Sequence, residues 1–320
     1  MSSENQNTSV RIAQAQATPA YGELDAALDR AADWCRRAAE AGARLLVFPE
    51  TWLGGYPAWL DLASDVALWG HRPTQDVYVS MRRHALTVPG PHADRLGELA
   101  KQHELVIAMG ANERVDAGPG NRTLYNSLLI WGADGQLVIH HRKLVPTYTE
   151  KLVWGGGDGH GLHGAKTAAG RLGGLICWEH WMPLPRQRLH DFGEQIHIAM
   201  WPTVKDLHQL ASRHYAVEGR CFVLAVGSIL RAGELPEQLS TAEAMADHEL
   251  VMSGGSAVIG PDGGYILEPL FGEEALRVCD LDLTEIDRQA LTLDTSGHYA
   301  RRDLFTLGFD PGPPRQAGEP

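Results

Sequence analysis

Three reactive side chains each follow a short apolar run of the sequence. Glu50 follows LLVFP, Lys143 follows LVIHHR and Cys177 follows LGGLI. A thiol is a nucleophile, a carboxylate can move the proton that the thiol loses, and an ammonium group neutralises negative charge that develops on a substrate. Ligands of α/β proteins bind where strands end, which favours one shared site. Antiparallel strands of a mixed sheet end on opposite edges, so the spacing alone leaves this convergence open.

Cys177 differs from the other three cysteines in its surroundings. Cys35 lies on the apolar face of a predicted helix, and Cys221 and Cys279 lie in predicted strands, so core packing explains them. Cys177 ends a strand and is followed by WEH, which leads toward a helix, as in a nucleophile elbow. A helix N-terminus and a nearby ammonium group would both favour the thiolate, so we expect Cys177 to be the nucleophile. The alternative is a buried, unreactive cysteine.

The candidate partners of Cys177 each have a second interpretation. Glu50 is either a solvated charge or a carboxylate among aromatic residues, whose raised pKa suits a general base. Lys143 is either part of a basic surface cluster, HHRK, or a cation held in the site. Glu150, seven positions after Lys143, is interpreted as a surface partner of Lys151 or Lys143. His180, three positions after Cys177, offers a Cys–His dyad as an alternative.

We expect neither a cofactor nor a metal ion. Gly159, Gly161 and Gly164 spell GxGxxG, but no long strand precedes them and no regular helix follows, so a dinucleotide site is not expected. Lys166 and Thr167 lack the glycines of a phosphate-binding loop. The 15 histidines include no HExxH motif and no paired Cys/His spacing.

The elements that would position these groups alternate between strands and helices. Apolar periodicity predicts helices at 24–38, 92–103, 182–191 and 205–219, and strands at 10–18, 45–48, 104–110, 124–131, 136–141, 172–177, 195–200, 221–228, 255–260, 264–268 and 275–281. The strands at 124–131 and 136–141 are predicted to form a hairpin, and residues 231–250 a surface excursion. Without a repeat or a dividing linker, we expect a single mixed α/β domain over 10–308, a disordered segment 1–9 and a flexible tail 309–320.

The composition limits the partners and the compartment. The chain has 28 Lys and Arg residues against 40 Asp and Glu residues, a net charge of −12, which repels nucleic acid and anionic lipid. The four cysteines form no CxxC pair and the first residues lack the regions of a signal peptide, so we predict a cytoplasmic protein. No apolar run approaches the roughly 18 residues that span a bilayer, so we expect no membrane partner.

Three longer blocks resemble the signature blocks of the carbon–nitrogen hydrolase superfamily. They are FPETWLGGYPAW, HRKLVPTYTEKLVWGGGDG and GGLICWEHWMPL, and the CWE of the third is similar to the nitrilase branch. The resemblance implies a four-layer α-β-β-α sandwich that assembles into homodimers or larger homo-oligomers. It implies that Glu50, Lys143 and Cys177 form a catalytic triad, with Glu150 supporting the lysine and the substrate.

The resulting hypothesis is a nitrilase, which converts a nitrile into a carboxylic acid and ammonia through a thioimidate and a thioester on Cys177, without a cofactor. Tyr56 and Trp178, beside the catalytic blocks, are the expected substrate-binding residues, with packing in the core or at a dimer interface as their alternative. For Trp59, substrate binding and packing are equally compatible with the sequence. The same triad could instead serve an amidase, a carbamoylase or a cyanide-degrading enzyme. A catalytically silent oligomeric scaffold is the alternative outside enzymes.

Overall fold

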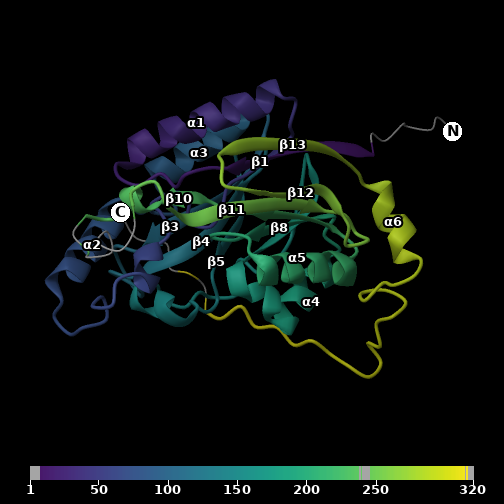
Figure 1. Ribbon diagram of the computed structural model, residues 1–320. Helices are drawn as coiled ribbons and strands as arrows, with labels where there is room; N and C mark the ends of the chain where they lie inside the picture. Colours follow the sequence, from purple (N-terminus) through teal and green to yellow (C-terminus); the bar gives the residue numbers. More distant parts are fainter. Residues whose placement is uncertain (1–7, 238, 240–245, 314, 316–320) are drawn as a thin grey trace.

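Two β-sheets lie face to face between two layers of helices (Figure 1). The computed structural model describes residues 8–237, 239, 246–313 and 315. The first sheet has the order β13-β1-β2-β3-β4-β5 and the second the order β10-β11-β9-β8-β7-β6, with β12 paired to β11. Helices α1 and α3 cover the first sheet, and α4 and α5 cover the second (Figure 1). The structure confirms the expected α-β-β-α sandwich.

The strands have the following bounds. The first sheet contains β1 (Ser9–Gln16), β2 (Leu45–Val47), β3 (Val106–Arg114), β4 (Leu124–Trp131), β5 (Leu137–Arg142) and β13 (Ala275–Asp282). The second contains β6 (Ala165–Thr167), β7 (Gly170–Ile176), β8 (Ile196–Met200), β9 (Phe222–Val226), β10 (Ile229–Arg231), β11 (Leu250–Ile259) and β12 (Tyr265–Phe271).

The α-helices are α1 (Leu24–Glu40), α2 (Arg72–Arg83), α3 (Pro91–Gln102), α4 (Pro183–Phe192), α5 (Asp206–Gly219) and α6 (Thr284–Ala290). Short 3-10 helices are η1 (Ala58–Asp61), η2 (Tyr148–Leu152), η3 (Cys177–Trp181) and η4 (Ala232–Glu234). Two of these short helices, η2 and η3, carry residues of the predicted site.

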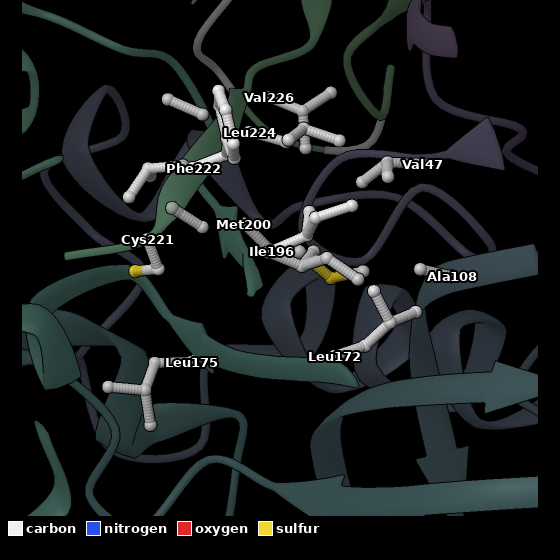
Figure 2. Close-up of a cluster of buried hydrophobic side chains, with 14 of the residues drawn as sticks. Val47, Ala108, Leu172, Leu175, Ile196, Met200, Cys221, Phe222, Leu224 and Val226 are labelled. Atoms are coloured by element: carbon white, nitrogen blue, oxygen red, sulfur yellow. The ribbon is translucent and has the colours of Figure 1, made fainter. Parts of the chain in front are cut away.

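Both faces of β2 in the first sheet are buried, which explains its uniformly apolar sequence. Side chains alternate between the faces of a strand, so Leu45 and Val47 of β2 pack toward the second sheet, whereas Leu46 packs under α1 and α3. The core between the sheets is shown in Figure 2, where Val47 and Ala108 of the first sheet join residues of β7, β8 and β9. This packing fixes the two sheets against each other.

The strand directions bring two predicted site residues to one sheet edge. Strands β2 and β3 are parallel, β3 and β4 are antiparallel, and β4 and β5 are again antiparallel. Because the direction reverses twice between β3 and β5, β5 runs in the same direction as β2. Glu50 and Lys143, which follow β2 and β5, therefore emerge at the same edge.

The predicted elements are confirmed in their order, and the expected hairpin is formed by β4 and β5. Helices α2 and α6 were not predicted. Only Val77 and Met81 of the twelve residues of α2 are buried, and no residue of α6 is, so neither has a strong apolar stripe. Among the described residues, no helix has the length and apolar composition to cross a membrane.

The segment 231–250 is more than the predicted surface excursion. Leu235 and Leu239 are buried in a cluster with Trp59 and Met81, because an apolar side chain gains free energy by leaving water. Residues 238 and 240–245 lie outside the described residues.

The chain ends were predicted to be loose. Strand β1 begins at Ser9, and residues 1–7 lie outside the described part. In the tail, Arg315 forms an ion pair of 2.7 Å with Asp158, and the Gly159 N–H donates to the Pro311 carbonyl at 3.1 Å. The domain limits at 10 and 308 and the flexibility of the tail stay predictions.

Candidate active site

Glu50, Lys143, Glu150 and Cys177 meet in one buried cluster. Lys143 Nζ lies 3.0 Å from Glu50 Oε1 and 2.7 Å from Glu150 Oε2. A carboxylate oxygen of each glutamate and the Cys177 sulfur all lie within 4.8 Å of one another. The four side chains come from the ends of β2, β5 and β7 and from η2, and each is at most 3% exposed. The structure therefore brings the three predicted residues and Glu150 together.

Glu50 lies in a tight turn directly after β2. The next residue, Thr51, has a φ of 44°, and a Cβ added to Gly110 of β3 would lie 2.6 Å from the Thr51 nitrogen and 2.9 Å from the Glu50 Cα. Only glycine leaves room for this turn against β3. Glu50 is thereby held deep inside the molecule instead of in solvent.

The two oxygens of Glu50 have different surroundings. Oε1 accepts hydrogen bonds from Asn126 Nδ2 at 2.6 Å and from Lys143 Nζ at 3.0 Å, whereas Oε2 has no partner among the described residues. Burial raises the pKa of Glu50 to about 7, although attraction from Lys143 opposes this. A carboxyl group with this pKa and a free oxygen can accept and return a proton near neutrality.

Lys143 carries the positive charge of the cluster. Burial opposes this charge, but attraction from Cys177, Glu50 and Glu150 outweighs it and raises the pKa of Lys143. The segment is fixed on both sides, because the Lys143 N–H donates to the Asn126 carbonyl and the Gly157 N–H donates to the Lys143 carbonyl, each at 2.8 Å. The glycine-rich loop thus packs on the catalytic segment.

Glu150 is a buried member of the site and not a surface partner of Lys151. Its Oε2 also accepts a hydrogen bond from the Thr147 N–H at 2.6 Å, and its Oε1 accepts one from the Tyr56 hydroxyl at 2.8 Å. The carboxylate therefore fixes the direction of the Lys143 ammonium group relative to the loop that begins η2.

Cys177 begins η3 at a sharp bend, as the elbow motif predicts. Its φ of 53° lies in the left-handed region, which non-glycine residues adopt only where the surroundings hold them there. Lys143 favours the thiolate, as expected, but other effects are larger. Burial raises the pKa of Cys177 well above its ordinary value, and repulsion from Glu50 adds to this, while attraction from Lys143 is too weak to cancel them. The thiol needs a base to become a nucleophile.

Tyr56 and Trp178 occupy different places relative to the cluster. Tyr56 contacts it through Glu150 and lines a cavity of about 190 Å³ with Tyr21, Trp59 and Met81. Trp178 is 43% exposed and its ring packs beside Trp181 and His208, although its backbone N–H lowers the pKa of Cys177. Trp59 is buried in an apolar cluster.

Two further residues, Asn126 and Glu179, shape the site and were not among the predicted site residues. Asn126 lies inside the apolar strand β4, and its polar type at a buried position was the available signal. Glu179 accepts hydrogen bonds from the backbone N–H groups of Ile176 and Leu144, each at 2.7 Å. It thereby joins the segment carrying Cys177 to the segment carrying Lys143.

The cluster also has the donor types of a cation site. The ligand atoms of Glu50, Glu150 and Cys177 are close enough to hold a metal ion. The Lys143 ammonium group, however, lies within hydrogen-bond distance of both carboxylates. A metal ion would compete with this ammonium for the same oxygens, so the residues fit a lysine-centred cluster better than a metal site.

Comparison with known proteins identifies full-length relatives. The sequence pattern of the carbon–nitrogen hydrolase family matches residues 11–290. A bifunctional nitrilase/nitrile hydratase NIT4A of Lupinus angustifolius is 35% identical over 96% of this chain and 88% of its own. An aliphatic nitrilase of Sinorhizobium fredii is 34% identical over 96% of this chain and 97% of its own. The crystal structure of a carbon–nitrogen hydrolase from Helicobacter pylori superposes with a TM-score of 0.68 at 15% identity, covering 93% of this chain and 97% of that one.

Proposed function

Because the chain belongs to the nitrilase branch of the carbon–nitrogen hydrolase family, we propose that it hydrolyses a nitrile to a carboxylic acid and ammonia at the Cys177 cluster. The observation that carries the proposed roles is the meeting of thiol, carboxyl and ammonium groups in one buried cluster. Each group supplies one requirement of the reaction: Cys177 the nucleophile, Glu50 the proton transfer and Lys143 the positive charge.

The reaction begins when the Cys177 sulfur attacks the nitrile carbon. A carbon–sulfur bond forms, one carbon–nitrogen π bond breaks, and the thiol proton passes through Glu50 to the nitrogen, which gives a thioimidate. The free Oε2 of Glu50 is suited to receive this proton, because Oε1 is already bound to Asn126 and Lys143. Lys143 stabilises the negative charge that develops during the attack.

Two water molecules complete the reaction. The first loses a proton to Glu50 and adds to the thioimidate carbon, and Glu50 returns this proton to the nitrogen, which becomes NH2. Glu50 then moves the hydroxyl proton of the adduct to the same nitrogen as the carbon–nitrogen bond breaks, so that ammonia leaves and a thioester remains. The second water, again deprotonated by Glu50, attacks the thioester, and the carbon–sulfur bond breaks to release the acid and restore the thiol. One nitrile and two waters thus give one acid and one ammonia.

A minor amide product is expected from the same intermediate. If the carbon–sulfur bond breaks before the carbon–nitrogen bond, the adduct of the first water leaves as an amide. The observation that favours this second outcome is the bifunctional nitrilase/nitrile hydratase name of one full-length relative. The fraction of amide among the products would depend on whether the nitrogen or the sulfur of the adduct is protonated.

The proposal also covers the substrate contacts and the assembly. Tyr56 is proposed to border the substrate, because its hydroxyl donates a hydrogen bond to Glu150 of the buried cluster. Trp178 is proposed to contact it through the backbone N–H beside Cys177. A homodimer or larger homo-oligomer is supported by exposed apolar residues on neighbouring helices, namely Leu184, Leu207 and Leu210. A cytoplasmic location is supported by the four unpaired cysteines.

The test is a panel of aliphatic, arylaliphatic and aromatic nitriles with the matching amides and with cyanide, scored by release of ammonia and acid. We expect nitriles to be hydrolysed and the Cys177→Ala variant to be inactive and folded. Cys221→Ala, which removes a buried sulfur outside the cluster, is the matched control and should retain activity. Turnover of Cys177→Ala near the wild-type rate would overturn the mechanism, and hydrolysis of amides alone would overturn the proposed substrate.

A further inference from the structure

A buried network of polar side chains lies behind Cys177 and has no part in the reaction described above. It starts at His180, continues to His197 and Glu194, and ends at Tyr215, all at most 3% exposed. These residues come from η3, β8, the turn before β8 and α5. Burial of a polar group costs free energy unless the group is hydrogen-bonded, so a buried network of this size indicates a specific role.

His180 contacts the backbone of Cys177 and not its sulfur, so the Cys–His dyad considered from the sequence is wrong. The Nδ1 atom of His180 lies 2.7 Å from the Cys177 carbonyl oxygen. A carbonyl oxygen can only accept, so this nitrogen carries the proton. Burial and repulsion from His197 lower the pKa of His180 well below its ordinary value, which leaves its Nε2 unprotonated and able to accept.

The next two members hold His180 in this tautomer. His180 Nε2 lies 3.0 Å from His197 Nε2, so His197 is the donor of that hydrogen bond. The other nitrogen of His197, Nδ1, lies 2.9 Å from Glu194 Oε2 and donates to it. His197 is therefore held between His180 and a buried carboxylate. Burial would raise the pKa of Glu194, but attraction and hydrogen bonds from His197 and His190 outweigh it and lower this pKa to about 2.

The surroundings keep this arrangement rigid. The Tyr215 hydroxyl donates to the other oxygen of Glu194, and its ring stacks on His197 with centroids 3.7 Å apart. The His180 ring stacks on Trp201 with centroids 4.8 Å apart. A Cβ at Gly173 of β7 would collide with the Glu194 carboxylate, so the glycine leaves the space that this group fills.

The hydrogen bond from His180 acts on the peptide group that follows the nucleophile. The Cys177 carbonyl and the Trp178 N–H belong to one planar trans peptide, so they point in opposite directions. His180 holds the carbonyl end, and the Trp178 N–H at the other end lowers the pKa of Cys177. Rotation of this peptide would break the hydrogen bond to His180, move the N–H and release the left-handed backbone at Cys177, where φ is 53°.

We propose that His180, held by His197 and Glu194, is a positioning residue that fixes the Cys177–Trp178 peptide and so aims its N–H at the reacting sulfur. The role rests on the proposed function only in that Cys177 is the nucleophile. In the reaction, this N–H supports the thiolate as it forms and stays beside the charge that develops next to the sulfur. His180 itself neither touches the substrate nor exchanges a proton with it.

Two variants of His180 separate this role from simple packing. His180→Phe keeps a ring on Trp201 but loses the donor, whereas His180→Asn loses the ring but places an amide N–H near the former Nδ1. We expect kcat of His180→Phe to fall by about 10- to 100-fold at nearly unchanged KM. This is less than the roughly 100- to 1,000-fold loss when a preorganised donor is removed, because the Trp178 N–H is displaced and not deleted. We expect His180→Asn to recover most of kcat.

A second measurement does not depend on nitrile turnover. The rate at which iodoacetamide alkylates Cys177, followed by peptide mass spectrometry as a function of pH, reports how readily the thiolate forms. We expect this pH profile to move to higher pH in His180→Phe and to stay near that of wild type in His180→Asn. Glu194→Gln, which removes the carboxylate that holds His197, should give a smaller shift of the same sign if His180→Phe does not fold.

The proposal is overturned if folded His180→Phe keeps the wild-type kcat and alkylation profile. It is also overturned if folded His180→Asn loses as much activity as His180→Phe, or if neither histidine variant folds and Glu194→Gln leaves both readouts unchanged. Failure of the proposed function looks different: wild-type protein would not hydrolyse any nitrile, while the alkylation profiles would still differ between the variants.

Discussion

The Glu179 carboxylate accepts a hydrogen bond of 2.7 Å from the backbone N–H of Leu144. Glu179 belongs to η3 of the nucleophile segment, and Leu144 directly follows Lys143, so this contact joins the two sheets at the active site. The other oxygen accepts a hydrogen bond of 2.7 Å from the Ile176 N–H, and His141 lies 2.9 Å away. Attraction from His141 and these hydrogen bonds outweigh burial and lower the pKa of Glu179.

Replacement of Glu179 by Gln should separate the two catalytic segments. A glutamine has one acceptor oxygen, so its NH2 group would face at least one of the N–H donors that the carboxylate now satisfies. We expect kcat to fall by roughly 10-fold or more and stability to fall by about 1–3 kcal/mol. Urea unfolding and steady-state kinetics measure both effects. Asp191→Asn, which alters an exposed acidic residue of α4, is the control. Equal effects of the two substitutions would show that Glu179 does not hold the two catalytic segments together.

The pH dependence of kcat/KM should report Glu50. Glu50 must be ionised to accept the thiol proton, so activity is lost as the pH falls below its pKa of about 7. Asn126→Leu removes the hydrogen bond that stabilises the ionised form, and we expect the acidic limb to move up by roughly one pH unit.

Ser127→Ala is the matched control for this shift, because Ser127 is the next residue of β4 and its hydroxyl binds Glu113 instead. Its acidic limb should coincide with that of wild type. If Asn126→Leu also leaves the limb in place, Glu50 is not the group that it reports.

Removal of the Lys143 charge should harm both stability and activity. Lys143→Met leaves two carboxylates buried without their cation, at a cost of about 3–5 kcal/mol, and it removes the positive charge that the reaction needs. We expect Lys143→Met with Glu150→Gln to regain part of the stability but no activity. Thermal unfolding and ammonia release measure the two properties, with exposed Lys151→Met as the control. Recovery of activity in the double variant would exclude a catalytic role of the ammonium group.

A second buried ion cluster should govern stability in acid. Burial alone would raise the pKa of Glu113. Hydrogen bonds and attraction from His140 and Arg142 outweigh this effect and lower the pKa to about 2. Because the unfolded value is near 4.5, this stabilisation is complete above pH 4.5 and is lost as the pH falls toward 2. The shift corresponds to about 3 kcal/mol.

Urea unfolding of wild type and Glu113→Gln at neutral and acidic pH tests this. The difference in unfolding free energy between them should be large at neutral pH and shrink as the solution becomes acidic. The exposed Glu98→Gln should show no such trend. A constant difference between wild type and Glu113→Gln would show that the charge of Glu113 does not govern acid stability.

Local patterns in the sequence were sufficient to predict most strands and helices and their order, whereas the four layers were implied only by the family resemblance. The helical spacing of Leu24, Leu28 and Cys35 marks the buried face of α1, and short apolar runs such as Leu45–Val47 mark strands buried on both faces. Helix α6 escaped prediction because none of its residues is buried, so its sequence carries no apolar stripe. Patterns of this kind exist only where an element packs against a core.

Residue types and strand ends indicated Glu50, Lys143 and Cys177, but the tertiary structure decided that they meet. Their meeting depends on the double reversal from β3 to β5 and on the stacking of the sheets, which no local pattern contains. Burial raised the pKa of the Cys177 thiol against the expectation from its neighbours in sequence. His180 likewise contacts the carbonyl oxygen of Cys177 and not its sulfur, which the sequence spacing did not indicate. The sequence specifies the chemistry of each side chain, whereas packing across the whole chain sets the distances between them.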